Sequence, residues 1–462
     1  MSPKLSYLKD KTVLILGFGR EGESTYNFLR KYFPKKELGI ADRKVVSSSG
    51  VLGKKLIKKD KLLNFHLGEK YLDSLSSYQV VFKTPGIPFK LPEIKEAKKA
   101  GVAFASQTKL FFGLCRGKII GVTGTKGKST TATLIHEILQ KAGFKSVLLG
   151  NIGIPALDYL DKDSKDIIFV FELSSHQLFD IKKSPNIAVI LNIFPEHLDY
   201  YENFNQYREA KSNIMRYQTS RDTFIYNKDN KYLRKLAGES KAIRISFSLS
   251  QKDYGDCYVE NGGIFFKKEK IMGVDEVSLK GSHNLNNIMA VINVCKSLGI
   301  ASSTIKSRIK AFKSLEHRLE ETRQYRGVTF VDDSISTIPE SSIAAMQTYR
   351  ERPTTVIIGG FDRGLDYSKL AKYISKSRSV KNVLLVGETS DRIGKILKSE
   401  KFRGKIYRMR RALMPDVVKT AFANTPKAGA VLLSPAAASF DMFEDYKERG
   451  ILFKKAVNKL KE

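Results

Sequence analysis

The chain has 462 residues and a formal net charge of +32, from 80 Lys and Arg against 48 Asp and Glu. At about 150 residues per domain, this length predicts about three domains, each with its own core. Hydrophobic residues make up 42% and charged residues 28% of the chain, which excludes wholesale disorder. Three cysteines are too few for a disulfide framework or a cysteine-type zinc site. No apolar run is long enough for a signal peptide or a membrane span, so we expect a soluble protein of a reducing, cytoplasmic compartment, without membrane insertion.

The excess of basic residues admits two interpretations. Nucleic-acid binding depends on Lys and Arg that neutralise phosphates, and it would produce salt-dependent retention on DNA. However, the basic residues are spread along the chain, as in Lys54-Lys55 and Lys454-Lys455. The sequence shows no helix-turn-helix, zinc-finger or RNA-recognition pattern. We therefore favour a lysine-rich, solubilising surface and expect no nucleic-acid partner.

Strand-like runs alternate with helix-like stretches along the whole chain. The runs are residues 12–16, 80–82, 118–122, 167–173, 187–192, 328–332, 355–358, 383–386 and 431–433. Several are continuously apolar, which is typical of parallel strands covered on both faces, and the alternation predicts an α/β architecture. New strand–loop–helix units begin near Gln107 and Ser314, which predicts domains at residues 1–107, 108–314 and 315–462.

The first strand-like run leads directly into a G-x-G-x-x-G turn at residues 17–22. Glycines permit a tight turn, and the following helix N terminus offers free N–H groups to a diphosphate. About 20 residues further on, Asp42, Arg43 and Lys44 stand where a Rossmann fold places its ribose-binding acid. The pattern favours nucleotide binding and leaves a dinucleotide-dependent oxidoreductase open. Asp42 beside two cations equally suits a surface turn.

A second strand–loop–helix unit carries a glycine loop followed by Lys128 and Ser129. The standard phosphate-loop pattern places a glycine at the position of Val122, so this loop is a variant. Backbone N–H groups of such a loop surround phosphates, the lysine supports the β- and γ-phosphate oxygens, and the serine hydroxyl can bind Mg²⁺. ATP binding is the firmest prediction from the residues themselves.

Polar residues follow the next two strand-like runs. Glu172 ends the first run, and Asn192 and His197 follow the second. Ligands in open α/β sheets bind beyond the carboxyl ends of strands, so we expect these side chains near the phosphate loop. A carboxylate beside Lys128 and Ser129 suits Mg²⁺ that bridges phosphates.

The ordered set of motifs resembles the Mur ligases, the ATP-dependent amide-forming enzymes of peptidoglycan synthesis, over essentially the whole chain. The motifs lie at residues 17–22, 84–87, 123–129, 150–153, 172–178, 196–199, 207–211, 281–284, 317–318, 333–334 and 434–439. Within the family, the chain is most similar to the enzymes that add D-glutamate to UDP-N-acetylmuramoyl-L-alanine. A sister Mur ligase or a folylpolyglutamate synthetase-like protein is the alternative, although the latter generally lacks the N-terminal UDP-binding domain.

The resemblance implies three domains with separate tasks. An N-terminal Rossmann-like domain would bind the UDP end of the substrate, a central P-loop-type ATPase domain would bind ATP, and a C-terminal Rossmann-like domain would bind the amino acid. It also implies a bacterial cytoplasmic ligase with small-molecule substrates, two Mg²⁺ ions and an acyl-phosphate intermediate. We expect a monomer.

The resemblance also assigns roles to individual residues. The catalytic residues would be Lys128, Glu172, His197 and Lys211, and the metal ligands Ser129, Glu172, His197 and Lys211. The residues for the UDP substrate would be Gly17, Phe18, Gly19, Arg20, Asp42, Arg43, Lys44, Thr84 and Asn151. Those for ATP would be Gly124, Thr125, Lys126, Gly127, Lys128, Ser129, Thr130, Asn284, Asn287, Arg318 and Asp333. Those for the amino acid would be Thr337, Arg363, Ser439, Phe440 and Tyr446.

Lys211 lies on the predicted helical stretch 204–217, where a solvated surface lysine is the default expectation. The family carbamylates the matching lysine, which would turn a cation into a Mg²⁺ ligand beside His197. Asn284 and Asn287 can share one side of a predicted helix start, and Asn284 also suits an N-cap.

Two positions in the amino-acid site depart from the family pattern. Better-known members of the D-glutamate branch have lysines where this chain has Ile335 and Arg363. Arg363 can bind a carboxylate bidentately, although arginine and lysine are not interchangeable.

Overall fold

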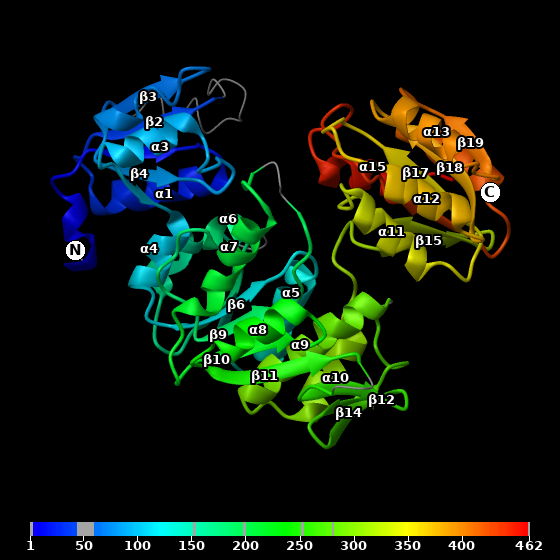
Figure 1. The fold of residues 1–462 in the computed structure, drawn as a ribbon, viewed down its shortest axis with the longest axis horizontal. Coiled ribbons are helices and arrows are strands. Elements are labelled where there is room, and N and C mark those ends of the chain that lie inside the picture. Colours follow the sequence, from blue (N-terminus) through cyan, green and yellow to red (C-terminus); the bar gives the residue numbers. More distant parts are fainter. Residues whose placement is uncertain are drawn as a thin grey trace. The chain divides into compact units, whose positions relative to one another are not determined.

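The computed structural model describes residues 3–43, 60–150, 154–196, 200–250, 254–279 and 281–460. The chain divides into two compact units, one of residues 1–278 and 282–312, the other of residues 279–281 and 313–462. The first unit holds a five-stranded and a nine-stranded sheet, and the second holds a six-stranded sheet (Figure 1). The predicted α/β class is confirmed, whereas the domain limits at 107 and 314 stay predictions.

The five-stranded sheet is parallel throughout, in the order β3-β2-β1-β4-β5. Its strands are β1 (Val13–Leu16), β2 (Leu38–Asp42), β3 (Leu63–Leu67), β4 (Val80–Lys83) and β5 (Ala103–Ala105). Ile15 belongs to the same core cluster as the buried residues of α1 (Arg20–Tyr32), whereas Leu14 and Leu16 join those of α3 (Pro92–Lys99). Cover on both faces explains why β1 is apolar at every position.

The nine-stranded sheet has the order β14-β13-β12-β11-β10-β9-β6-β8-β7, and its neighbouring strands are parallel except in the pairs β12–β13 and β13–β14, which are antiparallel. Its strands are β6 (Lys118–Thr123), β7 (Ser146–Gly150), β8 (Ile168–Glu172), β9 (Ile187–Ile190), β10 (Thr223–Asn227), β11 (Ile243–Ser248), β12 (Cys257–Glu260), β13 (Gly263–Phe266) and β14 (Glu269–Gly273).

Helices cover this sheet and place its functional loops. Buried residues of α4 (Gln107–Leu114) and α7 (Phe204–Arg216) share a core cluster with β6, β8 and β9. A second group, α5 (Lys128–Lys141), α9 (Ser282–Ser297) and α10 (Ser302–Ala311), packs together. The short helices α6 (Ser175–Leu178) and α8 (Lys231–Gly238) pack on α7 and β10 respectively. Within the described residues, no helix combines the length and apolarity needed to cross a membrane.

The six-stranded sheet has the order β15-β16-β20-β17-β18-β19, with only β15 antiparallel. Its strands are β15 (Glu320–Tyr325), β16 (Val328–Asp332), β17 (Thr354–Gly359), β18 (Val380–Val386), β19 (Lys405–Arg408) and β20 (Ala430–Leu433). Val356 and Ile358 pack with α11 (Pro339–Thr348), α12 (Ser368–Lys376) and α13 (Ser390–Ser399). Ile357 packs with α14 (Met414–Asn424) and α15 (Tyr446–Asn458), so helices cover both faces, as in a Rossmann-like fold.

Candidate active site

The predicted phosphate loop joins β6 to α5 and is held by Asn192, which follows β9. Thr125 N donates to Asn192 O at 2.9 Å, and Lys126 N donates to Asn192 Oδ1 at 2.9 Å. Asn192 Nδ2 donates in return to Lys126 O at 3.0 Å. Gly127 has φ of +89°, and a Cβ there would lie 2.2 Å from Asn287 Oδ1 of α9. Only glycine therefore fits between α9 and this loop, whose end exposes the first N–H groups of α5.

Lys128 begins α5 and folds back over the loop. Its Nζ donates to Gly124 O and to Thr125 O, both at 3.0 Å. Ser129 and Thr130 follow in the first turn and are buried. A lysine and a hydroxyl at the positive end of a helix form an arrangement suited to phosphates.

Lys211 of α7 reaches the same loop from the other side. It is 2% exposed, and its Nζ donates to Gly124 O at 2.9 Å and to Thr123 Oγ1 at 3.4 Å. Burial and then the charge of Lys128 lower the pKa of Lys211 well below its ordinary value, although Glu196 acts in the opposite direction. The expectation of a solvated surface lysine is therefore wrong, because α7 turns this position into the core.

Glu172 is the buried acid of the site. It ends β8 directly beside Val122 of β6 and is 3% exposed. Its Oε2 has no hydrogen-bond partner in the part of the chain that the structure describes. A buried carboxylate oxygen without a partner is costly unless a cation binds it. This donor ends the strand paired with β6, which leads into the phosphate loop, and it fits a hard divalent cation such as Mg²⁺.

Tyr207 was not predicted as part of the site, yet it supports the loop. It lies one turn before Lys211 on α7, its OH is 2.9 Å from Thr125 Oγ1, and the Lys211 ammonium lies 4.9 Å from its ring centroid. Phe194 N also donates to Thr125 Oγ1, at 3.0 Å. The i, i+4 spacing of Tyr207 and Lys211 was the available signal, because residues so spaced share a helix face.

The first glycine turn lies at the carboxyl ends of β1, β2 and β4. Phe18 N donates to Asp42 Oδ2 at 2.6 Å, and Thr84 Oγ1 donates to Leu16 O at 3.1 Å. Gly17 has φ of +90°, and a Cβ there would lie 2.1 Å from Thr84 Oγ1. The structure thus brings the glycine turn, Asp42 and Thr84 together. Asp42 stabilises the turn by accepting a hydrogen bond from the backbone N–H of Phe18.

Of the other residues predicted for the UDP substrate, some lie near this turn and others lie outside the residues that the structure describes. Arg20 Nη2 donates to Gly150 O at 2.9 Å, which links the turn to the end of β7. Arg43 is exposed at the end of β2. Lys44, Asn151 and His197 lie outside the described residues.

Asn284 and Asn287 share one side of α9, as predicted from their spacing. Asn287 Nδ2 donates to Asn284 Oδ1 at 3.1 Å, and both side chains are buried. The N-cap expectation for Asn284 is wrong, because α9 already begins at Ser282.

In the C-terminal unit, Asp333 is buried just beyond the end of β16. Ser434 Oγ donates to Asp333 Oδ2 at 2.7 Å, and Leu319 N donates to Asp333 Oδ1 at 3.2 Å. Burial raises the pKa of Asp333 to about 6, although hydrogen bonds from Ser336 and Ser434 and the charge of Arg318 act in the opposite direction. Asp333 and Arg318, both predicted for ATP, therefore interact within this unit.

The fully buried Arg449 connects the predicted nucleotide and amino-acid segments of this unit. Its Nε donates to Ser334 Oγ at 3.0 Å, its Nη2 to Ser334 O at 2.8 Å, and its Nη1 to Ala437 O at 3.2 Å. Ser334 Oγ donates in turn to Tyr446 O at 2.7 Å. Arg449 was not predicted from the sequence, since a single arginine in a helical stretch carries no signal of burial.

The residues predicted for the amino acid differ in exposure. Ser439 is buried, Thr337 is half-buried and Phe440 is 57% exposed. The guanidinium of the exposed Arg363 lies 5.4 Å from the Phe440 ring centroid. An exposed arginine beside an aromatic ring can bind a carboxylate ligand without first breaking a buried ion pair.

Comparisons with known sequences identify relatives along the whole chain. A family model described as the Mur ligase middle domain matches residues 122–295. A protein of Acetivibrio thermocellus named UDP-N-acetylmuramoylalanine–D-glutamate ligase is 34% identical, over 98% of this chain and 97% of its own length. A protein of the same name from Caldicellulosiruptor saccharolyticus is 36% identical, over 97% of this chain and 99% of its own length.

Comparisons with solved structures give the same fold. The UDP-N-acetylmuramate-alanine ligase MurC of Thermotoga maritima superposes with a TM-score of 0.61 at 17% identity, covering 98% of this chain and 100% of that one. The MurF ligase of Thermotoga maritima, solved in complex with ADP, gives 0.58 at 17% identity, covering 97% of this chain and 95% of that one. At this identity the likeness shows the fold alone.

Proposed function

The chain belongs to the Mur ligase family, and we propose that it is an ATP-dependent ligase that adds D-glutamate to UDP-N-acetylmuramoyl-L-alanine. The shared name of the full-length relatives supports this substrate pair. The observation that carries the chemistry is the phosphate loop, where Lys128 and Lys211 both donate to Gly124 O and where Glu172 Oε2 has no hydrogen-bond partner among the described residues. We place the enzyme in the bacterial cytoplasm as a monomer that acts on small molecules.

The proposed reaction begins with ATP on the phosphate loop. The N–H groups at the start of α5 bind the phosphates, and Lys128 Nζ leaves the loop carbonyls to contact the β- and γ-phosphate oxygens. Ser129, Glu172, His197 and carbamylated Lys211 would hold Mg²⁺, with two ions expected, and the metal would neutralise charge on the phosphates.

The bond changes follow from this placement. The alanyl carboxylate attacks the γ-phosphorus in line, and ADP leaves. The acyl phosphate is then attacked by the neutral amine of D-glutamate, and the tetrahedral intermediate loses one proton from nitrogen and expels inorganic phosphate to leave an amide. Exclusion of water protects the acyl phosphate from hydrolysis, which is the expected purpose of domain closure.

Burial supports the proposed carbamylation of Lys211. A neutral amine is a nucleophile, and the environment of Lys211 disfavours its ammonium form. Its nitrogen would form a bond to the carbon of CO₂ and lose a proton, which yields a carbamate anion. The carbamate would place an anion near the positive charge of Lys128, which attracts it, whereas Lys128 repels the ammonium form of Lys211.

The two substrates are assigned to separate surfaces. The glycine turn, Asp42 and Thr84 would bind the UDP end, since backbone N–H groups and hydroxyls meet there at one sheet edge. Arg363 would bind the side-chain carboxylate of D-glutamate, with Phe440 beside it. Thr337, Ser439 and Tyr446 would complete the amino-acid site.

Phosphate release from ATP and Mg²⁺ tests the proposal. Release should require UDP-N-acetylmuramoyl-L-alanine together with D-glutamate, and L-glutamate, L-lysine or no amino acid should not replace it. Lys128→Met should abolish release, whereas Lys141→Met, which removes an exposed lysine from the other end of α5, should not. Release that depends on a different amino acid would move the chain to a sister activity and contradict the proposal.

A further inference from the structure

Lys83 is a buried lysine that the proposed reaction does not use. It ends β4, is 4% exposed, and directly precedes Thr84. Its Nζ donates to Ile87 O at 2.6 Å, to Thr84 O at 3.1 Å and to Tyr200 OH at 3.5 Å. Two of these acceptors belong to the turn at residues 84–87, and the third comes from the segment between β9 and α7.

Tyr200 also contacts this turn. Its OH donates to Ile87 O at 3.0 Å, so this carbonyl accepts from both Lys83 and Tyr200. The Tyr200 ring lies against His176, with 4.0 Å between ring centroids. Tyr200 follows Glu196 in the chain and precedes α7, which carries Lys211. The contact therefore joins the turn at residues 84–87 to the segment that leads into α7, whose Lys211 contacts the phosphate loop.

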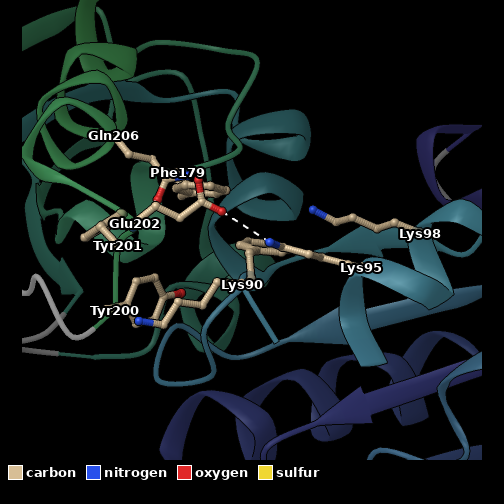
Figure 2. A pocket seen from close by; sticks show the side chains of 9 residues that line it. Lys90, Lys95, Lys98, Phe179, Tyr200, Tyr201, Glu202 and Gln206 are labelled. Carbon is tan, nitrogen blue, oxygen red and sulfur yellow. Dashed lines mark hydrogen bonds and ion pairs between the residues drawn. The ribbon is translucent and has the colours of Figure 1, made fainter. Parts of the chain in front are cut away.

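A cavity of about 200 Å³ next to this contact shows how the two segments face each other. In Figure 2 the side chain of Lys90 lies beside Tyr200, and Phe179 and Tyr201 line the same cavity. Across it, Lys95 of α3 forms an ion pair with Glu202 at 3.2 Å. Both members of that pair are about half exposed, at 54% and 52%, so it contributes little to the alignment of the segments.

We propose that Lys83 is a positioning residue for the UDP substrate, which fixes the turn at residues 84–87 against Tyr200 and so aligns the UDP site with the phosphate loop. The inference rests on the proposed function, which assigns Thr84 to the UDP site. It adds a residue that acts through this turn rather than by contact with substrate.

The chemistry of the site requires a lysine rather than an apolar residue. An ammonium has three N–H donors and no acceptor, which matches the two carbonyls and one hydroxyl around Lys83 Nζ. All three partners are neutral oxygens, so the buried charge is costly, and burial lowers the pKa of Lys83 to about 8. The preceding residues of β4 are apolar, and packing alone would be served by another apolar side chain. A satisfied polar network instead specifies one arrangement of the turn.

Steady-state kinetics of Lys83→Met and Tyr200→Phe test the inference. Each variant should raise the KM for UDP-N-acetylmuramoyl-L-alanine about tenfold and leave the KM for ATP unchanged, since a hydrogen bond to a charged group is lost only at the UDP turn. The double variant should be no worse than Lys83→Met, because both groups act on Ile87 O. Lys95→Met, which removes the exposed bridge between the same segments, is the matched control and should leave both KM values unchanged.

The outcomes separate positioning from mere support of the fold. A purely structural role would lower the melting temperature and the active fraction at unchanged KM, which would overturn the inference. If Lys83→Met does not fold, Tyr200→Phe carries the same test, because it keeps the ring and removes only the hydroxyl. Absence of substrate-dependent phosphate release by the unmodified enzyme would overturn the proposed function itself, whereas an active enzyme with unchanged KM values in the variants would overturn only this inference.

Discussion

Asp333 combines a proposed role in ATP binding with a cost to folding. Its carboxyl group is buried, and this burial raises its pKa to about 6, against about 3.9 in an unfolded chain. The folded protein therefore binds the proton more tightly than the unfolded chain does. The stability of the C-terminal unit should fall as the pH rises from about 4 to about 6, and the full cost is present above the folded pKa.

Asp333→Asn removes this titration with little change of shape. A difference of about 2 pKa units corresponds to about 3 kcal/mol. The amide oxygen can still accept from Leu319 N, and the Ser434 hydroxyl can rotate to accept from the amide NH₂, at a cost of about 1 kcal/mol. We expect the variant to have a free energy of unfolding about 2 kcal/mol higher at about pH 7.5, and no higher at about pH 4.

Urea unfolding of the full chain, followed by far-ultraviolet circular dichroism, measures this difference at both pH values. Glu351→Gln is the matched control, because the Glu351 side chain is 85% exposed and its replacement should shift neither curve. An Asp333→Asn effect of equal size at both pH values would refute the reasoning, because the carboxyl would then titrate as it does in the unfolded chain. The same variant should raise the KM for ATP, which separates its functional role from its effect on stability.

Four further substitutions address the site directly. Gly127→Ala should cost about 1–3 kcal/mol of stability and abolish ATP binding in calorimetry, because its Cβ would lie 2.2 Å from Asn287 Oδ1 at φ of +89°; unchanged ATP affinity would contradict the loop geometry. Glu172→Gln should raise the Mg²⁺ concentration for half-maximal activity at least about tenfold, and an unchanged titration would remove Glu172 from the metal site. ¹³C-bicarbonate should give a carbamate resonance in the unmodified enzyme that Lys211→Arg lacks, and a signal in both would assign it elsewhere. Arg363→Gln should raise the KM for D-glutamate about tenfold with the KM for ATP unchanged, and the reverse pattern would contradict its assignment.

The sequence predicts the framework of this fold well because parallel strands covered on both faces are apolar at each position. All nine strand-like runs correspond to strands of the structure. The strands β12, β13 and β14 were not predicted, because they are only four or five residues long and partly exposed. Their pairing depends on contacts between residues, which an apolar-run criterion does not detect.

The site was predictable where backbone geometry imposes a residue type, and not where a side chain acts through distant partners. Gly127 must be glycine, so the loop has a recognisable pattern. Lys211 and Lys83 look like ordinary surface lysines in the sequence, because their burial depends on strands and helices remote in the chain. Asn192 could be placed at a strand end, but its double hydrogen bond to Lys126 required coordinates.

In the proposed reaction, ATP activates the alanyl carboxylate as an acyl phosphate on the loop that precedes Lys128. The most direct test supplies UDP-N-acetylmuramoyl-L-alanine labelled with ¹⁸O in that carboxylate, together with ATP, Mg²⁺ and D-glutamate, and analyses the released phosphate by mass spectrometry. We expect one ¹⁸O atom in each inorganic phosphate, because the carboxylate oxygen that attacks phosphorus leaves with it. Phosphate without ¹⁸O, formed along with the amide product, would contradict the proposed reaction.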